Sequence, residues 1–103
     1  MKDIQKKVKL FCENNKLNSP IEHRVLDTMS ELGEVAKEIL KMSDYGDRPI
    51  QYNDNLKMEL GDLLYSIITI ANVFDIDLDE ALNEVLKKYE QRMHKGSPSS
   101  DNN

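Results

Sequence analysis

Several residue types that build other classes of protein are scarce in this chain. Its 103 residues include one cysteine, four glycines and three prolines. The lone Cys12 cannot close a disulfide within the chain, which fits a reducing compartment, so we expect a cytoplasmic protein. So few glycines and prolines cannot supply the turns of a many-stranded β fold, and no segment shows a convincing strand pattern.

Basic clusters and long hydrophobic runs are also missing. The net charge is −5, and no group of lysines and arginines forms the positive face that nucleic-acid binding needs. The same acidic balance disfavours an anionic membrane surface. The longest uncharged run, residues 63–74, is shorter than the roughly 20 residues that span a bilayer. We therefore expect neither a nucleic-acid partner nor a membrane partner.

What remains is a charged, helix-forming composition, with 32% charged and 39% apolar residues. Apolar spacing predicts four helices, at about 2–15, 20–42, 53–74 and 78–94. Ser19 and Asp77 are predicted N-caps, because a glutamate follows each three residues later and completes a capping box. Residues 43–52 read as a loop. We expect one helical domain over residues 1–94 and a disordered tail over 95–103.

The third predicted helix is apolar nearly all the way round. From residue 60 to residue 74, Asp62 is its only charged residue. Such a helix is buried, either by the rest of its own bundle or by a partner chain. A chain this short also buries only a modest core by itself. The expected fold is therefore an all-α, four-helix bundle assembled as a dimer or a dimer of dimers.

Two segments of the predicted helices, residues 29–35 and 57–63, share the pattern Glu-Leu-Gly followed by an acid. Acids three residues apart project from the same side of a helix. Packing the two helices together would bring four carboxylates to one place, namely Glu31, Glu34, Glu59 and Asp62. Carboxylates so placed repel one another unless hard cations lie between them, and Mg²⁺ suits both carboxylates and phosphate substrates.

The alternative is that these acids form an ordinary solvated face. That reading suits Glu31 and Glu34 taken alone, but Glu59 and Asp62 begin the apolar helix, where unpaired acids are costly. Gly33 and Gly61 lie between the paired acids, and each glycine costs about 1 kcal/mol relative to alanine inside a helix. We expect these glycines to mark a close helix crossing that lets the acid pairs approach.

The four-acid pattern with its two Leu-Gly pairs resembles the signature of the MazG-like nucleoside triphosphate pyrophosphohydrolases. The resemblance covers residues 19–92. It implies a Mg²⁺ site at Glu31, Glu34, Glu59 and Asp62, with Mn²⁺ as a substitute metal, and a hydrolase that converts a nucleoside triphosphate to the monophosphate and pyrophosphate. It also implies that Lys88 and Arg92 contact phosphates. It further implies a homodimer or homotetramer.

Some roles stay open at this stage. Lys57, close to Glu59, is a further candidate phosphate contact. The alternative for Lys57, Lys88 and Arg92 is an ordinary solvated position. Glu34 and Glu38 are both candidates for activating water. The competing functions are a phosphoribosyl-ATP pyrophosphatase-like enzyme and a non-catalytic helical interaction module.

Overall fold

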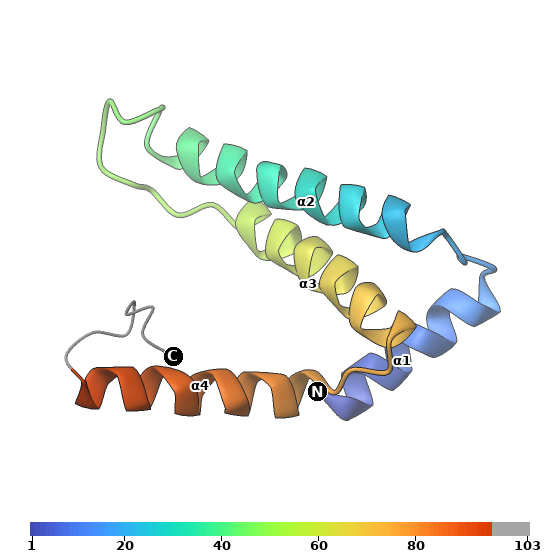
Figure 1. Ribbon diagram of the computed structural model, residues 1–103. Coiled ribbons are helices and arrows are strands. Elements are labelled where there is room, and N and C mark those ends of the chain that lie inside the picture. The colour runs from blue at the N-terminus through green and yellow to red at the C-terminus, as the bar shows by residue number, and fades with distance from the viewer. Residues whose placement is uncertain (96–103) are drawn as a thin grey trace.

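The chain folds into four helices, as the apolar spacing predicts. The computed structural model describes residues 1–95, and no strand occurs among them. The helices are α1 (Lys2–Asn14), α2 (Ile21–Met42), α3 (Asn55–Val73) and α4 (Leu78–His94), shown in Figure 1. The all-α class is confirmed. From Gly96 onward, the tail predicted over residues 95–103 lies outside the described residues.

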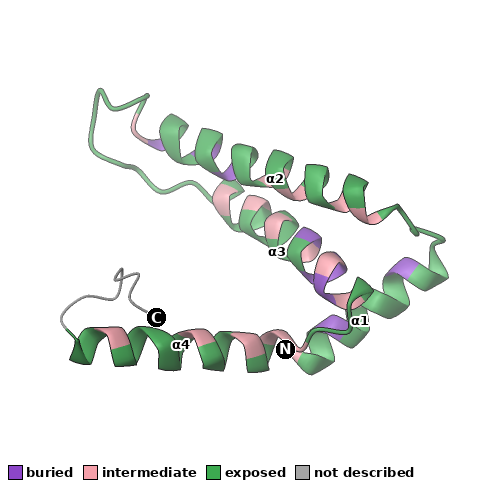
Figure 2. Ribbon diagram, viewed as in Figure 1, coloured by how far each residue is buried: buried purple, intermediate pink, exposed green. Residues whose placement is uncertain are grey.

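Helices α2 and α3 form an antiparallel pair, joined by the loop of residues 43–54 (Figure 1). Their facing sides carry much of the small core, including Val35 and Met42 of α2, each less than 9% exposed. The burial colouring of Figure 2 shows that the outer sides of both helices remain exposed. One chain therefore covers only the facing sides of α2 and of the first half of α3.

The second half of α3 packs against α1. Ile68 is 1% exposed and Cys12 of α1 is buried. The Cys12 Sγ atom lies 3.3 Å from the Tyr65 hydroxyl oxygen, and the ring of Phe11 meets the ring of Tyr65 edge to face at 6.3 Å. Cys12 is thus a packed thiol with a hydrogen-bond partner.

A buried glutamine fixes the turn between α3 and α4. The Gln5 Nε2 group donates to the Ile76 carbonyl at 2.7 Å and to Asn72 Oδ1 at 3.2 Å. The Gln5 Oε1 atom accepts from the backbone N–H of Leu78 at 2.9 Å. The side chain of Asp77 caps α4 by accepting from the N–H groups of Asp79 and Glu80, so this N-cap prediction is confirmed.

Helix α4 leaves the other helices after its first turn. Figure 1 shows α3 and α4 meeting at the turn and then diverging, and no residue of α4 is buried. Its apolar stripe includes Leu82, Leu86 and Met93, which are 54–61% exposed. One chain therefore leaves the apolar stripe of α4 uncovered.

Two local expectations are wrong. The first concerns the predicted Ser19 capping box. The N-cap of α2 is Pro20, and no side chain caps this end of the helix. The backbone carbonyl of Pro20 accepts hydrogen bonds from the N–H groups of His23 and Arg24. A Cβ atom added at Gly33 or Gly61 would meet nothing within 4 Å, so neither glycine marks a close crossing within the chain. The acid pairs approach without help from these glycines.

The α2–α3 pair has two unlike sides. At 100° per residue, the acids of both helices fall on one side of the line of contact and large apolar residues fall on the other. We call this second side the apolar face. It consists of Val25, Met29, Leu32 and Ile39 of α2 and Leu60, Leu64 and Ile67 of α3, which are 38–66% exposed.

The rest of one chain leaves this face open to solvent. Within the described residues, none of the helices combines the length and the apolar character needed to cross a membrane.

Candidate metal centre

Three of the four predicted acids meet where the middle of α2 packs against the start of α3. Glu31 of α2 and Glu59 and Asp62 of α3 each place a carboxylate oxygen within 4.8 Å of the other two. Glu31 and Glu59 are half-buried, and Asp62 is exposed. The meeting follows from the helical spacing, because residues three apart share a side and the two helices pack along those sides.

Two more acids of α2 surround this group. The pKa of the Glu59 carboxyl is raised above its ordinary value, first by partial burial and then by the charges of neighbouring carboxylates. In decreasing order of effect, these neighbours are Asp62, Glu34, Glu31 and Glu38. We call the five residues the acidic cluster. Glu34 thus acts on the group electrostatically, although its oxygens lie outside the three that converge.

The burial of Glu38 was not predicted from the sequence. This residue continues the stripe of Glu31 and Glu34 by one turn, and the structure leaves it only 9% exposed. A buried carboxylate is costly unless its charge is compensated. The signal was present in the sequence as the i, i+4 spacing, but burial of this position depends on how the 43–54 loop folds back over the end of α2.

The acidic cluster has the chemistry of a site for a hard divalent cation. Carboxylate oxygens converge, partial burial and mutual repulsion raise the pKa of Glu59, and no basic side chain forms an ion pair with these acids among the described residues. Mg²⁺ and Mn²⁺ both take oxygen ligands of this kind. The donor set therefore fits the metal that the sequence suggested.

The predicted phosphate contacts lie apart from the cluster in a single chain. Lys57 is exposed, and helix geometry turns it about 160° away from Glu59. Lys88 and Arg92 lie on α4, which diverges from α3 (Figure 1). Both of their cationic groups lie over the Tyr89 ring, at 5.4 Å and 5.9 Å from its centroid. The structure does not bring these three residues to the acids of their own chain.

A polar cavity of about 310 Å³ adjoins the acidic cluster at the end of α2. We call it the loop pocket. Its walls come from the end of α2, the 43–54 loop and the first residue of α3. It is lined by Glu38, Lys41, Met42, Arg48, Gln51, Tyr52, Asn53 and Asn55. Glu38 lines the pocket and its charge also acts on Glu59, so the pocket lies near the cluster.

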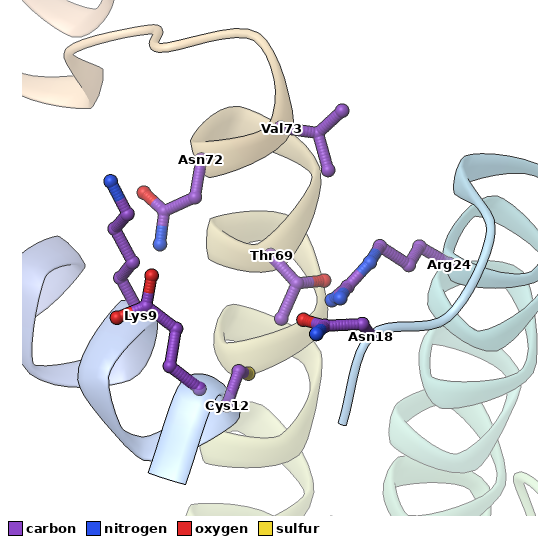
Figure 3. Close-up of a pocket in the computed structure, with 8 residues that line it drawn as sticks. Lys9, Cys12, Asn18, Arg24, Thr69, Asn72 and Val73 are labelled. Carbon is purple, nitrogen blue, oxygen red and sulfur yellow. The ribbon is translucent and has the colours of Figure 1, made fainter. Parts of the chain in front are cut away.

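A separate cavity of about 150 Å³ lies among α1, the start of α2 and the end of α3 (Figure 3). In Figure 3, Arg24 and Asn18 point toward Thr69 of α3, and Cys12 lines the opposite wall. None of the acidic cluster lines this cavity, and its volume is below the roughly 300 Å³ at which small-molecule sites begin. The chemistry is therefore concentrated at the other end of α3.

The chain is similar to known proteins in sequence and in fold. Residues 21–97 match the model of the MazG nucleotide pyrophosphohydrolase domain. The uncharacterized protein YpjD of Bacillus subtilis strain 168 is 34% identical over 97 residues, covering 89% of this chain and 85% of that protein.

Two solved structures are similar in fold. One is the crystal structure of a Bacillus-conserved MazG protein, described as a nucleotide pyrophosphohydrolase, with a TM-score of 0.72 at 30% identity, covering 85% of this chain and 86% of that chain. The other is the crystal structure of YpjD from Bacillus subtilis, also with a TM-score of 0.72 at 30% identity, covering 85% of this chain and 92% of that one.

Proposed function

Because this chain belongs to the MazG nucleotide pyrophosphohydrolase family, we propose that it is a Mg²⁺-dependent hydrolase that converts a nucleoside or deoxynucleoside triphosphate to the monophosphate and pyrophosphate. The observation that carries the proposal is the convergence of Glu31, Glu59 and Asp62 within 4.8 Å. Three carboxylates that repel one another at one place are stabilised by a divalent cation between them.

The proposed metal ligands are Glu31, Glu34, Glu59 and Asp62. The raised pKa of Glu59 supports this set, because partial burial and then the charges of the neighbouring carboxylates raise it. When bound, Mg²⁺, or Mn²⁺ in its place, supplies positive charge that polarises the phosphate oxygens. The four acids are also the proposed catalytic residues.

The protein's own groups have separate tasks. Glu34 or Glu38 accepts the proton of the attacking water, since both acids lie beside the converging group and carry negative charge. Lys57, Lys88 and Arg92 are the proposed contacts for the phosphates. Positive groups of this kind stabilise the charge that develops on departing pyrophosphate.

We further propose that the chain works as a homodimer or a dimer of dimers. The apolar face and the stripe on α4 are both uncovered in one chain, and burial of apolar surface on this scale drives association. The position of Lys88 and Arg92, away from the acids of their own chain, supports an assembly in which α4 lies against another subunit (Figure 1).

A nucleotide panel tests the proposed activity. Purified protein is incubated with each of the four ribonucleoside and four deoxynucleoside triphosphates and with phosphoribosyl-ATP, with Mg²⁺ or with chelator, and products are separated by anion exchange. We expect pyrophosphate and a monophosphate from at least one nucleoside triphosphate, in Mg²⁺ only. Cleavage of phosphoribosyl-ATP alone would favour the narrower enzyme, and no product from any compound would favour the non-catalytic module.

A further inference from the structure

The loop pocket lies where a second part of a bound nucleotide would fall. Glu38 lines it, and the charge of the same carboxylate acts on Glu59 in the acidic cluster. A triphosphate held at the cluster would therefore have either its nucleoside end or its terminal phosphates beside the pocket. The volume of about 310 Å³ is within the roughly 300–1,000 Å³ range of small-molecule sites.

The pocket wall is built by specific hydrogen bonds. Arg48 Nη1 donates to the Met42 carbonyl and to Gln51 Oε1, both at 2.9 Å. The backbone N–H of Gln51 also donates to the Met42 carbonyl at 2.9 Å. The backbone N–H of Asn55 donates to Asn53 Oδ1 at 2.9 Å. These bonds hold the 48–55 segment against the end of α2, so its side chains line a defined space.

The charges in the wall decide which end of the nucleotide fits. The wall holds two cations, Lys41 and Arg48, and one carboxylate, Glu38, so its formal charge is only +1. Several N–H groups of Arg48 already donate to main-chain carbonyls of α2 and to Gln51. A wall with so small an excess of positive charge is a poor site for the terminal phosphates, because polyphosphate binding relies on several cationic donors.

We propose that the loop pocket binds the nucleoside portion of the substrate, an inference that rests on the proposed function. The carboxamides of Gln51, Asn53 and Asn55 supply donors and acceptors that match the hydrogen-bonding edge of a base or the sugar hydroxyls. The Tyr52 ring, 65% exposed, supplies an aromatic surface on which a base stacks. Selectivity among nucleotides then resides in the loop, and cleavage resides in the acidic cluster.

The test compares a nucleotide with a nucleoside-free ligand. Titration calorimetry in Mg²⁺ measures binding of the α,β-imido analogues of the four deoxynucleoside triphosphates and of inorganic tripolyphosphate. The variants are Tyr52→Ala, Asn55→Ala and Lys41→Ala. The matched control is Tyr45→Ala, since Tyr45 lies in the same loop and is 64% exposed, but does not line the pocket.

We expect Tyr52→Ala to weaken binding of the preferred analogue about 5- to 100-fold, as loss of one stacking surface does. Asn55→Ala should weaken it about 2- to 10-fold, as loss of one hydrogen bond does. Neither variant should change the affinity for tripolyphosphate, and Tyr45→Ala should bind both ligands as the unmodified protein does.

Other outcomes overturn the inference. Unchanged nucleotide affinity in both Tyr52→Ala and Asn55→Ala would remove the nucleoside from the pocket. Phosphates would occupy the loop pocket instead if Lys41→Ala lost affinity equally for the nucleotide analogue and for tripolyphosphate, while Tyr52→Ala lost no affinity specific to the nucleotide. The nucleotide panel separates the two proposals: if pyrophosphate is released and these variants bind normally, only the pocket assignment fails. If the unmodified protein binds no analogue and cleaves no nucleotide, both fail.

Discussion

Replacing Glu59 by glutamine separates a metal site from a merely acidic surface. In the metal-free protein this carboxylate is partly buried and faces four like charges, and both effects raise its pKa. Glu59→Gln keeps the shape of the side chain and removes one charge. We therefore expect the metal-free variant to melt at the same temperature as the unmodified protein or slightly higher, because like-charge repulsion is relieved.

In contrast, Glu59→Gln should reduce the stabilisation that the folded protein gains from Mg²⁺. A ligand that binds only the folded state at ten times its dissociation constant adds about 1.4 kcal/mol of stability. For a domain of this size that corresponds to a rise in Tm of roughly 6–11 °C. Differential scanning fluorimetry over a Mg²⁺ series should show this rise in the unmodified protein and a much smaller one in Glu59→Gln.

A matched variant distinguishes the site from general charge effects. Asp27 is an exposed acid of α2 outside the acidic cluster, so Asp27→Asn removes the same charge elsewhere on the helix. It should keep the full Mg²⁺ response. Equal Mg²⁺ responses in Glu59→Gln and the unmodified protein would show that the converging acids do not bind the ion, and the reasoning would be refuted.

Three further predictions concern stability, assembly and substrate contacts. Gln5→Ala should lower the free energy of unfolding by about 1–3 kcal/mol in urea titrations, because it leaves the Leu78 N–H and the Ile76 carbonyl without their partner; an unchanged midpoint would contradict the role of this side chain. Sedimentation velocity at micromolar concentration should show an oligomer that Leu32→Asp dissociates and Lys37→Asp on the same helix does not, and a monomeric unmodified protein would count against the assembly. Lys88→Ala should lower kcat/KM about 10- to 100-fold whereas the adjacent Lys87→Ala should not, and identical kinetics in the two variants would remove Lys88 from the proposed contacts.

The helices were predictable because their signals are local. Apolar spacing placed all four to within about two residues, and the Asp77 cap depended only on residues next to it. The convergence of Glu31 with Glu59 and Asp62 was also predictable, because acids three apart on two packed helices fall on one side. The prediction that Ser19 caps α2 was wrong because the N-cap position is occupied by Pro20, the residue directly after it.

What the sequence did not reveal depends on contacts between distant segments. The turn that leads into α4 is bonded to a buried glutamine in α1, whose partners lie more than 60 residues away. The loop pocket forms because Arg48 folds back onto the carbonyls at the end of α2, and the periodicity of a helix carries no information about that path. Gly33 and Gly61 face open space within one chain, so their pairing with the acids has no explanation in the contacts of that chain.

The most direct test of the central claim is where the oxygen of water ends up during turnover. The nucleotide that the panel identifies is hydrolysed in ¹⁸O-labelled water with Mg²⁺, and the products are weighed by mass spectrometry. Attack at the α-phosphorus, directed by the acidic cluster, predicts one ¹⁸O atom in the monophosphate, none in pyrophosphate, and no turnover in Glu59→Gln. Label in pyrophosphate or in orthophosphate, or full turnover by Glu59→Gln, would contradict the account.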